Sequence, residues 1–141
     1  MTSKFGFLPW SAINEKAEEV AASVDLPEDY RGRLVAQLSG GNQQKTLFGR
    51  GLGRDYEIYI FDEPTVGVDM GARASIYKLI KALTESGKAV VVISSDLPEV
   101  MNISHRLAVF SHGRISAELV GEEINETAVL AHFFEEQEES A

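Results

Sequence analysis

The pattern of apolar and polar positions predicts a strand, a helix and a second strand in the middle of the chain. Apolar runs within 57–61 and 89–93 are typical of strands that are buried in a sheet. The segment 70–86 between them predicts an amphipathic helix that ends before Gly87, because apolar residues recur at helical spacing: Ile76, Leu79, Ile80 and Leu83. This order favours two parallel strands joined by a crossover helix.

Further elements are expected on both sides of this unit. Helices are predicted over the ranges 11–24, 41–53, 97–103 and 124–134. Asp96 and Glu99 are spaced as in a capping box, and Pro98 fits the first turn, so the third of these helices has a defined start. Two short strands at 106–110 and 114–119 flank Ser-His-Gly and predict a hairpin.

We therefore expect an α/β fold in three parts. The segment 1–55 is predicted to be a helical subdomain. Residues 56–134 are predicted to hold the parallel βαβ core, followed by the β-hairpin and the C-terminal helix. The acidic end at 135–141 is predicted to be a solvated tail.

Composition excludes several classes of function. The 141 residues carry 13 basic and 22 acidic side chains, a net charge of −9, which disfavours binding to nucleic acid or to an anionic membrane. There is no cysteine, so disulfides and thiolate metal sites are excluded. No apolar run approaches the ~20 residues of a membrane helix, so we expect any membrane association to come through a partner.

Two motifs carry the candidate chemistry. Residues 38–45 read Leu-Ser-Gly-Gly-Asn-Gln-Gln-Lys, a glycine-rich turn that opens onto a helix. Glycine allows a ligand to approach the backbone closely, and the N–H groups at a helix start suit a phosphate. Residues 58–65 read Ile-Tyr-Ile-Phe-Asp-Glu-Pro-Thr, a strand that delivers two carboxylates to the ligand-binding edge of a sheet. A phosphate cradle with two acids is typical of phosphoryl transfer.

These motifs resemble those of ABC transporter ATPases. Residues 38–45 resemble the signature motif, 58–63 the Walker B strand with its adjoining catalytic glutamate, and Val68-Asp69 the D-loop. The Asn-Gln-Gln-Lys ending and the segment 93–100 are similar to the second nucleotide-binding half of importers for ribose, galactose, xylose and related sugars. The resemblance extends from about Phe5 to about Phe133 and implies a partial P-loop NTPase core.

The resemblance also implies roles for single residues. In this family two nucleotide-binding domains meet head to tail, and the signature motif of one contacts the ATP held by the other. The implied nucleotide-binding residues are Ser39, Gly40, Gly41, Gln43 and Asp69. Asp62 is implied to bind Mg²⁺ through water, and Glu63 to polarise the attacking water. Ser95 occupies the position at which the family usually carries a histidine that contacts the γ-phosphate.

The implied cofactors are therefore ATP and Mg²⁺. The implied partners are a second nucleotide-binding domain, a transmembrane permease subunit and, indirectly, a solute-binding protein, with no nucleic acid. The implied location is the cytoplasm, peripheral on the inner face of the cell membrane through the permease.

One expected motif is missing, and alternatives stay open. The sequence contains no G-x-x-x-x-G-K-[ST], with which P-loop ATPases hold their nucleotide, so we expect a C-terminal portion of an importer ATPase that is inactive alone. A soluble ABC-type ATPase outside transport and a catalytically silent module that docks on a full ATPase are the two rivals. At single positions, Ser39 and Asp69 also suit plain helix N-caps.

Overall fold

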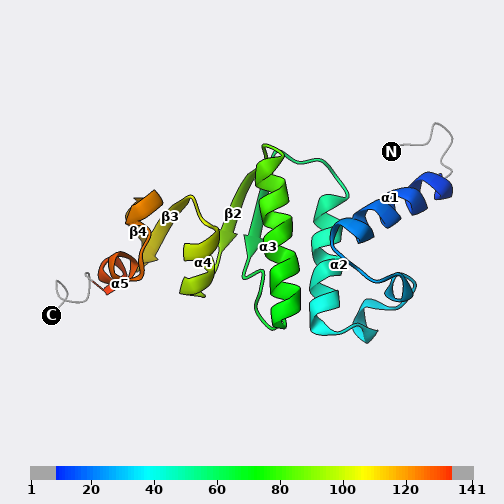
Figure 1. The fold of residues 1–141 in the computed structure, drawn as a ribbon, viewed down its shortest axis with the longest axis horizontal. Coiled ribbons are helices and arrows are strands. Elements are labelled where there is room, and N and C mark those ends of the chain that lie inside the picture. The colour runs from blue at the N-terminus through cyan, green and yellow to red at the C-terminus, as the bar shows by residue number, and fades with distance from the viewer. Residues whose placement is uncertain (1–8, 135–141) are drawn as a thin grey trace. The chain divides into compact units, whose positions relative to one another are not determined.

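The computed structural model describes residues 9–134, so the acidic tail predicted at 135–141 lies outside the described residues. The chain divides into two compact units, one ending at Ile93 and the other beginning at Ser94. Each unit contains one two-stranded sheet, parallel in the first and antiparallel in the second (Figure 1). Within the described residues, no helix is long and apolar enough to cross a bilayer.

The first unit is built around the predicted βαβ element. Its helices and strands are α1 (Trp10–Ser23), α2 (Gly40–Leu52), β1 (Ile58–Asp62), α3 (Met70–Glu85) and β2 (Ala89–Ile93), with two 3-10 turns, Glu28–Tyr30 and Val35–Gln37, between α1 and α2. The strands pair in parallel, with Ile60 opposite Val91. The parallel pair joined by a helix is therefore confirmed.

Two helices pack on one face of this sheet. The Phe48 ring on α2 lies 4.7 Å from the Phe61 ring on β1, measured between centroids, and α3 packs against β2. Ile76 and Ile80 on α3 are buried, as their spacing predicted. The apolar stripe of α3 thus forms the centre of the core of this unit, because a helix stabilises a sheet by burying such a stripe against it.

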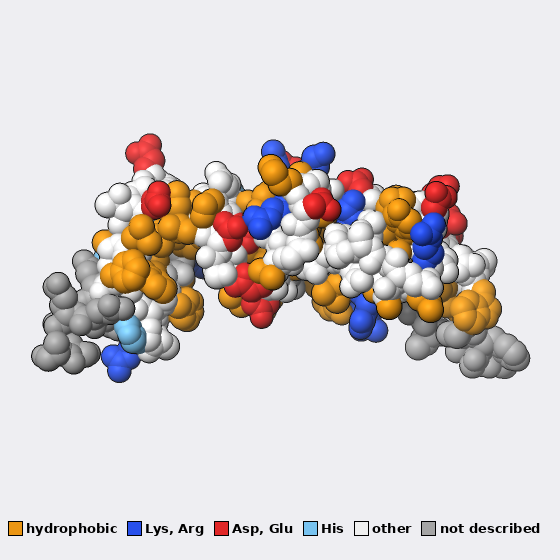
Figure 2. All heavy atoms as spheres, turned by 90° about the horizontal axis from the view of Figure 1, so that it is seen from below, with side chains coloured by type: hydrophobic (Ala, Val, Ile, Leu, Met, Phe, Trp, Pro, Cys, Tyr) orange, Lys and Arg blue, Asp and Glu red, His pale blue; other side chains and the backbone are white. Residues whose placement is uncertain are grey.

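The expectation that both strands are buried is wrong for their second face. Along β1 and β2 the side chains alternate, and those on one face are open to solvent: Ile58 is 62% exposed, Ile60 66%, Val91 47% and Ile93 52%. The reason is that α2 and α3, the helices of this unit that pack on the strands, cover the face that carries Tyr59 and Phe61. Figure 2 shows orange hydrophobic side chains at the surface among charged ones.

The second unit is a hairpin with two helices. Its elements are α4 (Leu97–Ile103), β3 (Arg106–Ser111), β4 (Arg114–Val120), the 3-10 turn Gly121–Glu123 and α5 (Glu126–Phe134). His112 and Gly113 turn the hairpin with φ of 49° and 77°, as a two-residue hairpin turn requires. Val109, Leu119 and Val129 form its core.

The last helix begins two residues later than predicted. Asn125 accepts a hydrogen bond from the Ala128 N–H through its Oδ1, at 3.0 Å, and so caps a helix that starts at Glu126. The residues before Asn125 form the short 3-10 turn instead of a further helical turn.

Candidate functional site

The glycine-rich turn opens α2 as the sequence predicted, but Ser39 does not cap it. Ser39 occupies the N-cap position with extended backbone, and its side chain accepts no N–H from the helix. Its Oγ instead accepts a hydrogen bond from Asn42 Nδ2 at 3.1 Å. The hydroxyl lies on an exposed residue at the helix start, so the alternative interpretation of Ser39 as a helix cap is not supported.

Gly40 and Gly41 lie against the segment that follows the two acids. A Cβ at Gly40 would lie 3.2 Å from the carbonyl oxygen of Gly67, and one at Gly41 would lie 2.9 Å from the Ala72 Cβ. Real Cβ atoms almost never approach another atom as closely as 2.9 Å. Internal packing therefore already requires glycine at Gly41, and a role in nucleotide binding stays a prediction.

The two adjacent glutamines of α2 face different partners. Gln43 donates from Nε2 to the carbonyl oxygen of Leu38 at 2.9 Å, which closes the glycine-rich turn on itself. Gln44 donates from Nε2 to the carbonyl oxygen of Pro64, also at 2.9 Å, and so reaches 20 positions along the chain. The sequence indicated a nucleotide contact for Gln43 and nothing for Gln44.

The two acids end β1 with different backbone conformations. Asp62 is the last residue of the strand and is exposed. Glu63 has φ of +46°, in the left-handed region, and its N–H donates to the carbonyl oxygen of Ile93 at 2.8 Å. A residue other than glycine is held in that region only where the surroundings determine the backbone, and such residues gather at functional sites. The Pro64 and Thr65 side chains that follow are the largest fully buried ones among the described residues.

Asp69 is the N-cap of α3. Its Oδ1 accepts the Ala72 N–H at 2.9 Å, so the predicted capping role is confirmed, and a D-loop role stays a prediction. Asp69 also lies close to the glycine-rich turn, since a Cβ at Gly41 would lie 3.4 Å from its Oδ2. The first unit thus brings the start of α2 against the loop that runs from Glu63 to Asp69.

Ser95 belongs to the second unit and is exposed. It lies between β2 and α4, next to Asp96, whose Oδ1 accepts the Glu99 N–H at 3.1 Å and caps α4. The cap that the sequence predicted for this helix is therefore confirmed. The geometry within the first unit does not include Ser95.

The carboxylate of Asp62 has the chemistry to bind Mg²⁺ that is already bound to a nucleotide. Among the described residues, no group of three or more histidine, aspartate or glutamate side chains could hold a metal ion by itself. Mg²⁺ bound to a nucleotide needs only one or two carboxylates, because phosphate oxygens and water fill its other positions. An exposed Asp62 at the carboxyl end of a parallel strand fits that chemistry.

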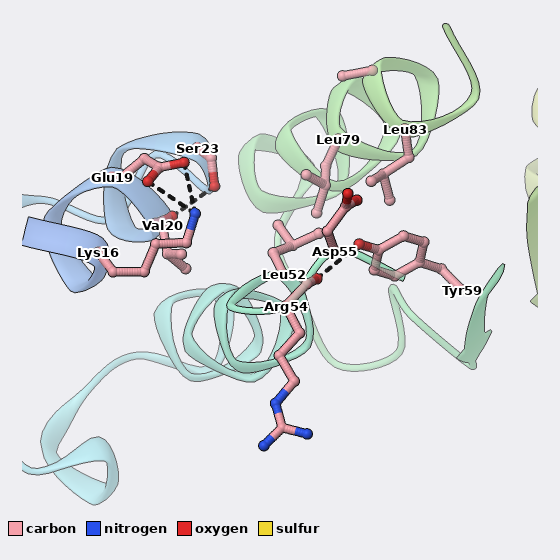
Figure 3. Close-up of a pocket in the computed structure, with 11 residues that line it drawn as sticks. Lys16, Glu19, Val20, Ser23, Leu52, Arg54, Asp55, Tyr59, Leu79 and Leu83 are labelled. Carbon is pink, nitrogen blue, oxygen red and sulfur yellow. Dashed lines mark hydrogen bonds and ion pairs between the residues drawn. The ribbon is translucent and has the colours of Figure 1, made fainter. Parts of the chain in front are cut away.

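A shallow hollow of about 380 Å³ lies elsewhere in the first unit. Figure 3 shows Lys16 and Glu19 of α1 paired on one side of it, and the Tyr59 hydroxyl donating to the Arg54 carbonyl on the other. None of the predicted site residues lines it. The candidate site is thus an exposed helix start and a strand end, and both lie outside this hollow.

Comparison with known proteins supports the resemblance to ABC transporter ATPases. No protein-family model matches the chain. The ribose import ATP-binding protein RbsA 2 of Streptomyces coelicolor is 42% identical over 130 residues, which are 92% of this chain and 25% of that protein. The RbsA 2 protein of Burkholderia ambifaria is 51% identical over 98 residues, or 70% of this chain and 19% of that protein. The chain spans about a quarter of the length of the curated relatives it matches.

The solved structures that resemble this fold are ABC cassettes. The dimeric structure of MJ0796, a bacterial ABC transporter cassette, matches with a TM-score of 0.74 and 29% identity, over 85% of this chain and 50% of that one. The cassette MJ1267 matches with a TM-score of 0.77 and 27% identity, over 92% of this chain and 53% of that one. The chain is therefore homologous to ABC transporter ATP-binding proteins and matches the C-terminal part of longer relatives, which are named as ribose import proteins.

Proposed function

We propose that this chain serves in the ATP-hydrolysing subunit of an ABC importer for a sugar or a related solute. The observation that supports the proposal is the contact between the start of α2 and the loop after Glu63, because the glycine-rich turn and the two acids, the two motifs with candidate chemistry, then belong to one unit. The relatives named as ribose import proteins support the solute class. Catalysis at such a site rests on positioning and on charge stabilisation of the phosphates.

Two half-sites divide the chemistry. The exposed Ser39 hydroxyl and the N–H groups at the start of α2 would contact the γ-phosphate of an ATP held by a second nucleotide-binding domain, with Gly40, Gly41 and Gln43 shaping the turn. MJ0796, a cassette of similar fold, is described as dimeric and, in another structure, as bound to ADP and Pi. That comparison supports a paired arrangement for this chain as well.

The other half-site is the one to which the acids belong. Asp62 would bind Mg²⁺ through water, and Glu63 would orient the attacking water. Asp69 would act at the boundary between the two domains. Ser95 can donate one hydrogen bond but cannot carry the charge of a histidine near neutral pH. Mg-ATP supplies the phosphoryl group, and its phosphates would be held by a P-loop, a motif that the 141-residue sequence does not contain.

The assembly would include a permease subunit in the membrane and, through it, a solute-binding protein. We place the chain on the cytoplasmic side of the membrane, held there by the permease. A catalytically silent role is the second candidate, and the observation that favours it is a serine at position 95.

The proposal is tested by blocking the half-site in trans. Ser39→Arg fills the start of α2 with a long cationic side chain, and we expect it to abolish the ATPase activity of the importer assembled with this chain while leaving its fold intact. Ser86→Arg, a change at an exposed serine at the end of α3, is the matched control and should keep normal activity. Unchanged turnover in Ser39→Arg would contradict the role in trans.

A second variant distinguishes the active from the silent form. Glu63→Gln keeps the size of the side chain and removes its charge, so an active site should bind ATP normally and hydrolyse it far more slowly. If hydrolysis does not change, the half-site to which Glu63 belongs is silent, and the second candidate is supported.

A further inference from the structure

We propose that Gln44 is a positioning residue, which ties the signature helix α2 to the loop after Glu63 and so sets where Glu63 presents its carboxylate. This inference rests on the proposed function, in which Glu63 orients the attacking water. No role was expected of Gln44 from the sequence, because its partner lies 20 positions further along the chain.

Two backbone hydrogen bonds within the loop after Glu63 are long. Val66 N–H donates to the Glu63 carbonyl at 3.3 Å and Val68 N–H to the Thr65 carbonyl at 3.4 Å, both long for such bonds. The bond from Gln44 Nε2 to the Pro64 carbonyl is shorter, at 2.9 Å, and is partly buried. This partly buried bond therefore fixes the loop to a neighbouring helix, in addition to the burial of the Pro64 and Thr65 side chains.

The bond acts next to a strained residue. Glu63 has φ of +46° and is followed by a proline, which restricts it further. On one side its N–H is fixed on Ile93, and on the other Gln44 fixes the next carbonyl along. The two bonds hold the backbone at both ends of the Glu63–Pro64 pair, and such external support is what a left-handed glutamate needs.

The same helix face carries the phosphate-binding turn. Gly40, which packs against Gly67, and Gln44, which binds Pro64, are four positions apart on α2 and so lie on one face of it. Since α2 is rigid between them, a displacement of its first turn moves Gln44 as well. Binding of the partner's nucleotide by Ser39 and Gly41 would thereby change the position of Glu63 in this chain's own half-site.

The hydrogen bond from Gln44 to the Pro64 carbonyl, here called the tether, is tested in the 141-residue chain by amide hydrogen exchange. Gln44→Leu removes the donor, and we expect the protection of the amides of Val66 and Val68 to fall about 3- to 10-fold. Gln44→Glu should show the same loss at about pH 8 and recover as the introduced carboxyl becomes protonated, because its O–H can then donate to the Pro64 carbonyl. Thr46→Val is the control, since it removes a 2.8 Å bond to Asn42 within α2 and none to the loop.

Protection that is equal in Gln44→Leu and the unchanged chain would overturn the tether. An equal loss of protection in Thr46→Val would overturn it too, because α2 as a whole, and not this bond, would then order the loop.

The positioning role is tested in the importer assembled with this chain. For Gln44→Leu we expect the single-turnover rate per bound ATP to fall about 3- to 10-fold, with ATP affinity within about threefold of normal. A rate per bound ATP is independent of the fraction of correctly folded protein, so a merely structural effect would not lower it. An unchanged rate, or a loss confined to affinity, would overturn the role. Absence of ATPase activity in the unchanged assembly would overturn the proposed function, whereas the exchange measurement judges the tether by itself.

Discussion

The N–H of Glu63 donates to the carbonyl of Ile93 one position beyond the last residue pair of the β1–β2 ladder, in which Asp62 lies opposite Ile93. The pairing of the two strands therefore extends up to the second acid. Because this bond fixes Glu63 where its φ is unfavourable, the position of the acid depends on β2 as much as on β1.

Glycine at position 63 should stabilise the chain and abolish the ATPase activity of the importer assembled with it. A non-glycine residue in the left-handed region costs roughly 1–2 kcal/mol, and glycine loses about 0.5–1 kcal/mol in backbone entropy. Glu63→Gly should thus raise the free energy of unfolding by roughly 0.5–1 kcal/mol, as measured by urea denaturation. Asp25→Gly, at φ of 52° outside the candidate site, should give a similar gain and leave the ATPase activity of the importer assembled with this chain unchanged. If Glu63→Gly is less stable than Glu63→Ala, the expected relief of the backbone at this position is contradicted.

Contact between α2 and α3 makes Gly41 sensitive to size. Gly41→Ala places a Cβ 2.9 Å from that of Ala72, and we expect a loss of about 1–3 kcal/mol in the free energy of unfolding. Gly51→Ala on the same helix meets no atom within 4 Å and should stabilise by about 0.5–1 kcal/mol. Chemical denaturation of the two variants decides, and equal effects would contradict this packing.

The cap and any further role of Asp69 can be separated. Asp69→Ala removes the acceptor for the Ala72 N–H and should cost about 1 kcal/mol, whereas Asp69→Ser keeps a capping oxygen and most of the stability. The pair Asp96→Ala and Asp96→Ser repeats the change at the cap of α4. If Asp69→Ser keeps its stability but the importer assembled with it loses ATPase activity, the carboxylate has a role beyond capping.

Exposed apolar residues of the β1–β2 sheet should contribute little to the stability of this chain. Ile60 is 66% exposed, so Ile60→Thr should change the free energy of unfolding by less than about 0.5 kcal/mol. Phe48 is 5% exposed and its ring contacts that of Phe61. Phe48→Ala should therefore lower the free energy of unfolding by about 3–5 kcal/mol. A large loss for Ile60→Thr at low protein concentration would mean that something covers this face.

Lys88 contributes a stabilisation of the fold that is lost at alkaline pH. Its Nζ lies 2.8 Å from Asp55 Oδ1 and 3.0 Å from Glu57 Oε1, and hydrogen bonds to these two carboxylates raise its pKa above 10.5. Since the pKa is raised on folding, the stabilisation is complete below about pH 10.5 and is lost as the pH rises through the folded value. The difference in Tm between the unchanged chain and Lys88→Met should therefore shrink above that pH. A constant difference would contradict the ion pairs.

Local patterns predicted the elements well and the exposure of the sheet poorly. The strand at 89–93 and the helix at 97–103 have the predicted bounds, because apolar runs and caps such as Asp96 are local signals. Ile58, Ile60 and Phe61 belong to one apolar run, which is typical of a strand covered on both faces. Nothing in that run tells which face a given chain covers, and here the described helices of the unit cover one.

The candidate site shows the same limit. Spacing could place Gly41 at a helix start and Glu63 at a strand end, since both depend on neighbours in sequence. It could not predict that Gln44 binds the Pro64 carbonyl or that Gly41 lies against Ala72, because these contacts join segments 20 or more positions apart. The sequence did not predict the left-handed backbone of Glu63 either, because the hydrogen bond that holds this residue comes from Ile93, on another strand.

The exposed face and the open edges of the β1–β2 sheet favour association between copies of the chain. In the described part of the chain this sheet has two strands, so each is an edge strand with backbone groups open to pairing. Edge strands beside exposed Ile and Val side chains are templates for strand addition, and charged residues or covering segments normally guard them. At high concentration we therefore expect the chain to form intermolecular sheets.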